Sequence, residues 1–157
     1  MADVPLETGV KAPEFTLPRD GGAPVSLSDY AGKPVVLFFY PKASTPGCTT
    51  EALDFTRLMP DFAAAGAAVL GMSKDSVKRQ ENFAAKQELS IPLLSDAGTA
   101  ICEAYGVWGE KKMYGKTFEG IFRTTYLIGP DGVIARVWPN VKVKGHADEV
   151  LEAVRAL

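Results

Sequence analysis

The sequence has few of the side chains that build covalent cross-links or metal centres. Its 157 residues include two cysteines, Cys48 and Cys102, and one histidine. Two cysteines are too few for a disulfide framework. Together with one histidine they also fall short of the roughly four ligands of a structural zinc site. No Cys-x-x-Cys pair occurs, and we expect neither a metal nor another cofactor.

Excess positive charge and long apolar runs are also missing. Lys and Arg number 17 against 19 Asp and Glu, a net charge of −2, which argues against nucleic acid as the main partner. No apolar run approaches the roughly 20 residues of a membrane helix. Residues 1–5 lack the basic and apolar regions of a secretory signal. With 46% hydrophobic and 23% charged residues, the sequence predicts one cytoplasmic domain over 1–157, with no membrane partner.

One stretch combines a buried strand, a polar turn and a helix that carries a cysteine in its first turn. The apolar run 34–40 leads into residues 41–45, and a helical pattern follows. With Thr45 as N-cap and Pro46 as first helical residue, Cys48 occupies the third position. Free N–H groups and the helix dipole favour a thiolate there. The alternative is an ordinary buried cysteine that acts as a small hydrophobe.

The remaining pattern alternates strands and helices. The sequence predicts strands at 15–17, 24–27, 35–40, 67–72, 92–95, 123–128 and 133–138, helices at 46–59, 61–65, 77–88, 100–105 and 146–157, and a long exposed loop at 106–120. Pro60 predicts a kink or break near Met59, at the end of the helix that carries Cys48, and His146 is interpreted as a helix cap or surface residue. The order, a βαβ half before a ββα half, resembles the thioredoxin fold, an α/β architecture whose central mixed sheet has helices on both faces.

The stretch around Cys48 resembles a known family. Pro41, Thr45 and Cys48 reproduce the Pro-x-x-x-Thr-x-x-Cys motif of the peroxiredoxins. The fuller run 45–51 is similar to the peroxiredoxin Q subfamily, also called bacterioferritin comigratory proteins. The resemblance implies a thiol-dependent peroxidase that reduces hydrogen peroxide and organic hydroperoxides, with Cys48 oxidised to sulfenic acid.

The resemblance also implies roles for individual residues. The segment 120–128 is similar to the one that supplies the peroxiredoxin arginine, here Arg123, whose permanent charge suits a thiolate and a peroxide oxygen. The alternative is a solvated arginine at a strand edge. Thr45 is expected to bind the peroxide as well as to cap the helix, and Pro41 to shield the sulfur from water. With the Cys48 N–H, Thr45 and Arg123 would stabilise the charge that develops on the leaving oxygen.

Three further residues have open roles. Glu51 is expected either to cap the first helical turn or to pair with a cation near the site. Tyr40 is interpreted either as a hydrogen-bonding residue near the pocket or as a core aromatic at the strand end. Cys102 is interpreted mainly as a buried apolar position, with a resolving role as the alternative; a disulfide to Cys48 would require Cα atoms within about 7 Å, or local unfolding.

The sequence departs from many subfamily members in lacking a resolving cysteine at the usual places. Leu53 occupies the position five residues after Cys48, and 83–85 on the next helix contain none. We therefore expect a one-cysteine cycle resolved by an external thiol. Thioredoxin, glutaredoxin and glutathione are all candidates, and the sequence does not choose among them. The alternatives are a thioredoxin-type disulfide oxidoreductase, disfavoured by the missing Cys-x-x-Cys, and a non-enzymatic thiol sensor or holdase. The resemblance favours a monomer over a dimer.

Overall fold

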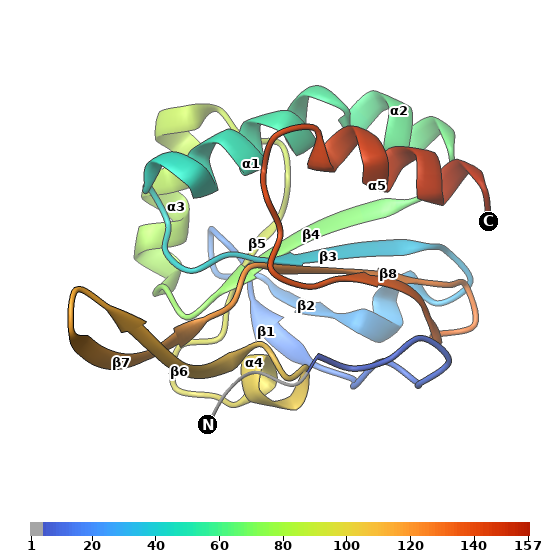
Figure 1. Cartoon of the computed structure of the whole chain (residues 1–157). Coiled ribbons are helices and arrows are strands. Elements are labelled where there is room, and N and C mark those ends of the chain that lie inside the picture. Colours follow the sequence, from blue (N-terminus) through green and yellow to red (C-terminus); the bar gives the residue numbers. More distant parts are fainter. Residues whose placement is uncertain (1–4) are drawn as a thin grey trace.

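A five-stranded mixed sheet forms the centre of the protein (Figure 1). The computed structural model describes residues 5–157. The strand order is β5 (Leu93–Ser95), β4 (Ala68–Ser73), β3 (Val35–Phe39), β8 (Thr124–Ile128) and β9 (Ile134–Trp138). The pairs β5–β4 and β4–β3 are parallel, whereas β3–β8 and β8–β9 are antiparallel. The predicted α/β class and mixed sheet are confirmed.

The middle strand, β3, is buried on both of its faces. Successive side chains of a strand point to opposite faces, so Val36 and Phe38 enter one core while Val35, Leu37 and Phe39 enter the other. All five residues of β3 are at most 2% exposed. The sheet therefore needs a cover on each side, which explains why the run is apolar at every position.

The longer helices cover one face of the sheet (Figure 1). They are α1 (Pro46–Arg57), α2 (Met59–Ala64), α3 (Val77–Gln87) and α5 (His146–Arg155). The chain breaks at Leu58, two residues before Pro60, as predicted. Phe55, Phe62 and Phe83 are fully buried in the core between these helices and the sheet. None of the described helices has both the length and the apolar character needed to cross a bilayer.

The other face has a thinner cover. It consists of the hairpin β1 (Thr16–Pro18) and β2 (Pro24–Ser26), the 3-10 helix η1 (Leu27–Tyr30) and the short helix α4 (Ile101–Ala104). Tyr105 and Tyr126 are fully buried in this second core, and the Tyr126 hydroxyl donates to the Tyr105 carbonyl at 2.5 Å. Helices on both faces are thus confirmed, but unequally distributed.

The prediction of a long loop at 106–120 is wrong. This segment forms a β-hairpin, β6 (Trp108–Met113) and β7 (Lys116–Ile121), outside the central sheet. Tyr114 and Gly115 make its turn with φ of 52° and 75°, a left-handed pair typical of two-residue hairpin turns. Most of its side chains are exposed, so the alternation of apolar and polar residues that normally reveals a strand is absent.

The interpretation of His146 as a cap or surface residue is also wrong. It is the first residue of α5 and only 6% exposed, and its Nε2 lies 2.8 Å from the Thr125 hydroxyl on β8. The rings of Phe55 and Trp138 contact it edge-on. Burial lowers the pKa of His146 to about 4, although the Glu149 carboxylate opposes this shift. The neutral ring thereby links α5 to the sheet.

Candidate active site

The loop from β3 to α1 carries the predicted nucleophile to the C-terminal end of the central strand. Thr45 is the N-cap of α1 and Pro46 its first residue, as predicted, so Cys48 occupies the third helical position. The Thr45 side chain does not cap the helix, because its Oγ1 donates to the Lys42 carbonyl at 2.8 Å. The first N–H groups of a helix have no acceptor within it. Those near Cys48 are therefore available to stabilise negative charge.

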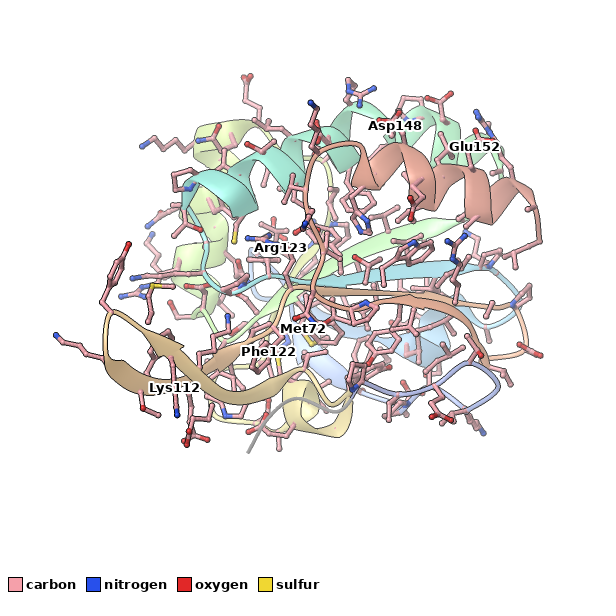
Figure 2. The ribbon with its side chains drawn as sticks, viewed as in Figure 1. Met72, Lys112, Phe122, Arg123, Asp148 and Glu152 are labelled. Atoms are coloured by element: carbon pink, nitrogen blue, oxygen red, sulfur yellow. The ribbon has the colours of Figure 1, made fainter. Side chains whose placement is uncertain are left out.

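Arg123, which is labelled in Figure 2, contacts the sulfur of Cys48. Its Nη2 donates to Cys48 Sγ over 3.3 Å. Arg123 directly precedes β8, although the predicted strand 123–128 included it, and β8 pairs with β3 so that Thr124 lies opposite Phe39. The sheet register thus brings together two residues that are 75 positions apart. Cys48 is 1% exposed, so the guanidinium acts on it with little screening from water.

Gly47 provides the space for this contact. A Cβ at this position would lie 3.2 Å from Arg123 Nη2, closer than the guanidinium tolerates without moving. The sequence motif includes this glycine, but its steric role is visible only once Arg123 is placed. Any side chain here would push the cation away from the sulfur.

Glu51 pairs with the same guanidinium, which is one of its two expected roles. Its Oε1 lies 2.7 Å from Arg123 Nη1, and the side chain is 1% exposed. Burial raises the pKa of Glu51 to about 7, even though the adjacent Arg123 charge opposes the shift. Oε2 is buried without a hydrogen-bond partner among the described residues, so the carboxyl can carry a proton there. Burial alone would lower the pKa of Arg123, but Glu51 and Cys48 outweigh it, and the net shift is upward.

A buried polar network fixes the loop that precedes the cysteine. The Tyr40 hydroxyl donates to Gln80 Oε1 at 2.5 Å, and Gln80 Nε2 donates to Ser73 Oγ at 2.9 Å. Ser73 donates to Asp75 Oδ2 at 2.6 Å, and the same oxygen accepts the Ala43 N–H at 2.7 Å. Burial raises the pKa of Tyr40 well above its ordinary value, which keeps the hydroxyl a neutral donor. Tyr40 is therefore both a core aromatic and a hydrogen-bonding residue.

Sequence reasoning missed Asp75, Ser73 and Gln80 in this network. The signal available was that Ser73 ends β4 and Asp75 follows it, while Gln80 lies on α3, the next helix. The C-terminal end of β4 lies beside that of β3 in a parallel pair. Polar residues at such strand ends commonly border the site of an α/β sheet.

Cys102 lies on the opposite face of the central sheet from Cys48. It lies on α4 and is fully buried in the second core, which confirms the prediction of a buried position. Its N–H donates to Asp96 Oδ2 at 2.8 Å. Burial, with a contribution from the Asp96 carboxylate, raises the pKa of the Cys102 thiol. The structure does not bring the two cysteines together.

An open groove runs beside the cysteine loop. It has a volume of about 930 Å³, with Pro41 and Thr45 on one wall and the β6–β7 hairpin on the other. Pro41 is half-buried there. Across residues 5–157, no group of His, Cys, Asp and Glu side chains has the arrangement of a metal site.

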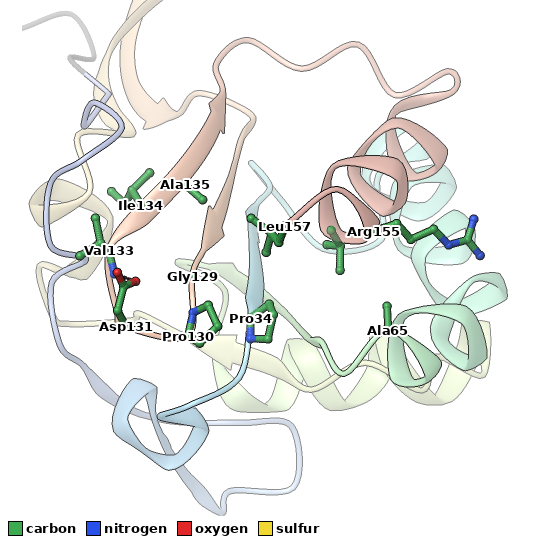
Figure 3. A pocket seen from close by; sticks show the side chains of 11 residues that line it. Pro34, Ala65, Gly129, Pro130, Asp131, Val133, Ile134, Ala135, Arg155 and Leu157 are labelled. Atoms are coloured by element: carbon green, nitrogen blue, oxygen red, sulfur yellow. Dashed lines mark hydrogen bonds between the residues drawn. The ribbon is translucent and has the colours of Figure 1, made fainter.

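A second hollow lies far from this chemistry (Figure 3). It has a volume of about 840 Å³ and is lined by Pro34, which precedes β3, by Gly129 and Pro130 after β8, and by Leu157. Cys48 follows the other end of β3. The lining carries no thiol or imidazole, so this hollow offers no nucleophile.

The arrangement around Cys48 suits nucleophilic chemistry by sulfur. A cation at 3.3 Å and a helix N-terminus both stabilise a thiolate. The same donors can stabilise an oxygen that gains charge close to the sulfur.

Comparisons with known proteins agree with this geometry. The AhpC/TSA family profile matches residues 8–137. Peroxiredoxin Bcp of Xanthomonas campestris is 49% identical over 156 residues, covering 99% of this chain and 98% of the relative. Peroxiredoxin Bcp of Escherichia coli is 45% identical and covers 94% of each.

A solved structure of the Xanthomonas campestris bacterioferritin comigratory protein superposes with a TM-score of 0.89. It has 47% identity and covers 96% of this chain and 98% of that one. The match covers nearly the whole chain, so the predicted thioredoxin-like fold is confirmed. The chain therefore belongs to the AhpC/TSA family and is a peroxiredoxin, a thiol-dependent peroxidase whose substrates are a peroxide and a thiol reductant.

Proposed function

We propose that Cys48 is the peroxidatic residue and that it works in a one-cysteine cycle. The Cys48 thiolate attacks one oxygen of a hydroperoxide, an S–O bond forms as the O–O bond breaks, and the leaving oxygen takes up a proton. The products are Cys48 sulfenic acid and water or an alcohol. The observation that carries this proposal is the 3.3 Å contact between Arg123 Nη2 and Cys48 Sγ at a helix N-terminus.

The surrounding residues take complementary roles in this attack. Arg123 stabilises both the thiolate and the charge on the leaving oxygen, together with the Cys48 N–H. The Thr45 hydroxyl donates to Lys42, so its oxygen remains an acceptor for the peroxide proton. Pro41, half-buried beside the groove, limits the access of water. Glu51 holds the guanidinium by its 2.7 Å ion pair.

The reductive half of the cycle uses an external thiol. Cys102 lies in the other core, which supports resolution by a thiol from outside the chain. One external thiol attacks the sulfenic sulfur, which forms a mixed disulfide and releases water. A second thiol then displaces Cys48 as thiolate and leaves the oxidised reductant as a disulfide. Since Cys48 is 1% exposed, the first turn of α1 opens for this step.

The groove indicates the substrate class. Apolar side chains of Pro41, Trp108 and Phe118 line it, which suits a hydroperoxide with an organic group as well as hydrogen peroxide. The Xanthomonas campestris relative has alkyl peroxide reduction activity, and we extend that activity to this chain. Thioredoxin, glutaredoxin or glutathione serves as reductant of a cytoplasmic, single-domain monomer. No observation favours the disulfide oxidoreductase or holdase alternatives.

The cycle is tested with a Cys102→Ser variant. Reduced wild type and variant are mixed with one equivalent of tert-butyl hydroperoxide, and the products are identified by mass spectrometry after trapping with dimedone. We expect dimedone at Cys48 in both proteins, and equal turnover with dithiothreitol. A Cys48–Cys102 disulfide in the wild type, with loss of turnover in the variant, would contradict the one-cysteine cycle.

A further inference from the structure

Exposed apolar side chains gather on the β6–β7 hairpin. Of the six large hydrophobic side chains that are exposed within residues 5–157, three lie on it: Met113 at 55%, Tyr114 at 96% and Phe118 at 43%. Single exposed hydrophobic residues are normal, but a contiguous group is typical of an interaction surface. The hairpin lies outside the central sheet and stands away from the core (Figure 1).

The strand register puts two lysines on one face of the hairpin and Glu110, Glu119 and Lys112 on the other. Lys111 lies opposite Phe118 and Met113 opposite Lys116; these four residues share one face, which we call the groove face because Lys111, Met113 and Phe118 line the groove. The alternating register puts the pair Glu110–Glu119 on the other face, although Glu119 also borders the groove. The groove face is thus basic and apolar.

The groove face is continuous with the active site. Pro41, Lys42 and Thr45 form the opposite wall of the same groove, and Thr45 is the N-cap of the helix that carries Cys48. The charged lining consists of Lys42, Lys74, Arg79 and Lys111 against Asp75 and Glu119. Lys74 is paired with Asp96 and Glu103, and Arg79 lies 3.8 Å from Asp75. The positive character of the groove therefore comes mainly from Lys42 and Lys111, in a chain whose net charge is −2.

We propose that the groove face, its turn residue Tyr114 and Lys42 form the docking surface for an acidic protein dithiol that reduces oxidised Cys48. This rests on the proposed one-cysteine cycle, in which Cys48 has no resolving thiol in its own chain. A small thiol requires no exposed apolar surface, whereas an apolar centre within a charged rim is the pattern of protein interfaces. Positive charge beside the site favours an acidic partner and accelerates its encounter.

The redox step balances with that partner alone. One thiol of the dithiol attacks Cys48 sulfenic acid, forms the mixed disulfide and releases water. The second thiol of the same partner then attacks the partner's sulfur atom in the mixed disulfide. Cys48 leaves as thiolate, and the partner departs with an internal disulfide.

The test uses the full-length triple variant Met113→Ser, Tyr114→Asn and Lys116→Glu. Asn tolerates the left-handed backbone at Tyr114, where φ is 52°. The reductant is thioredoxin kept reduced by thioredoxin reductase and NADPH, with glutaredoxin in a parallel assay and dithiothreitol as the small thiol. We expect KM for thioredoxin or glutaredoxin to rise at least about 10-fold. With hydrogen peroxide, which has no organic group to occupy the groove, turnover with dithiothreitol and the peroxide burst should not change.

A matched control exchanges Lys33→Glu and Leu157→Ser. Both residues are exposed and lie toward the other end of the sheet, and this variant should behave as wild type. Salt screens the attraction between the basic groove face and an acidic partner, so wild-type kcat/KM for the protein reductant should fall as salt rises from about 20 mM to about 300 mM. The fall should be smaller in the triple variant.

Several outcomes would overturn the proposal. The first is an unchanged KM of the triple variant for the protein reductant. The second is turnover of the wild type with glutathione but with neither thioredoxin nor glutaredoxin. The third is a loss of turnover in the triple variant that is as large with dithiothreitol as with the protein reductant. A wild-type dimer that the triple variant dissociates in sedimentation would assign the surface to a second copy instead. Failure of the cycle itself shows separately, as a wild-type Cys48–Cys102 disulfide in the dimedone assay.

Discussion

Replacement of Glu51 by Gln should make the protein more stable and slower. The pKa of Glu51 is raised from 4.5 to about 7, and each pKa unit corresponds to about 1.4 kcal/mol. Between these two pH values the unfolded chain has lost the proton that the folded chain keeps. The contribution of this group to stability is therefore fully present below pH 4.5 and is lost as pH rises through about 7. The loss amounts to about 3 kcal/mol.

Gln cannot ionise, so the Glu51→Gln variant avoids this loss. We expect the free energy of unfolding, measured by urea titration of reduced protein, to match wild type at pH 4.5. At pH 8 the variant should exceed wild type by up to about 3 kcal/mol. His146 is present in both proteins, so its contribution cancels when the two free energies of unfolding are subtracted. Glu110→Gln, at an exposed site on β6, serves as the control and should show no such trend.

Above pH 7, where Glu51 is ionised, the same substitution replaces the 2.7 Å ion pair that holds Arg123 with a neutral contact. A hydrogen bond to a charged group contributes about 1.5–3 kcal/mol, so the rate constant for peroxide should fall by about 10- to 100-fold. Stopped-flow fluorescence with tert-butyl hydroperoxide measures it. A stability difference that stays flat between pH 4.5 and 8 would refute the reasoning, because Glu51 would then be ionised throughout.

Three further predictions concern the site and its supports. Arg123→Met should lower the rate constant of Cys48 with peroxide by about 100- to 1000-fold, as measured by competition with horseradish peroxidase, and an unchanged rate would remove the guanidinium from the mechanism. Asp75→Asn should destabilise the fold by about 1.5–3 kcal/mol and slow the peroxide reaction, because the carboxylate that binds the Ala43 N–H loses its charge; urea titration and stopped flow check both. Because burial lowers the pKa of His146 from 6.5 to about 4, the folded protein favours the neutral ring. This contribution to the free energy of unfolding is fully present above pH 6.5 and is lost as pH falls through about 4. His146→Gln should abolish that part of the acid slope in urea titrations, and an unaltered slope would count against it.

Local patterns were sufficient to predict most elements around the cysteine. The apolar run before Pro41 predicted a strand buried on both faces, and Thr45-Pro46 predicted where the helix begins. Both signals depend on residues adjacent in sequence, which is why they were readable. The contact between Cys48 and Arg123 depends instead on the antiparallel register of β3 and β8, and only the family resemblance indicated it.

The two wrong predictions have different causes, one local in sequence and one distant. The 106–120 segment has few apolar residues to bury, so its strands form mainly through pairing with each other and a left-handed turn at Tyr114 and Gly115. His146 is buried because Phe55 and Trp138 enclose it, and no pattern within its own helix reveals them.

The central claim is that the Cys48 sulfur, held by Arg123 at a helix N-terminus, is the group that peroxide oxidises. Stopped-flow mixing of reduced protein with excess hydrogen peroxide, in the absence of any reductant, tests it most directly. The account predicts a rapid burst of peroxide consumption far faster than the reaction of free cysteine, lost entirely in Cys48→Ser and retained in Cys102→Ser. A burst that survives in Cys48→Ser, or a rate no greater than that of free cysteine, would contradict it.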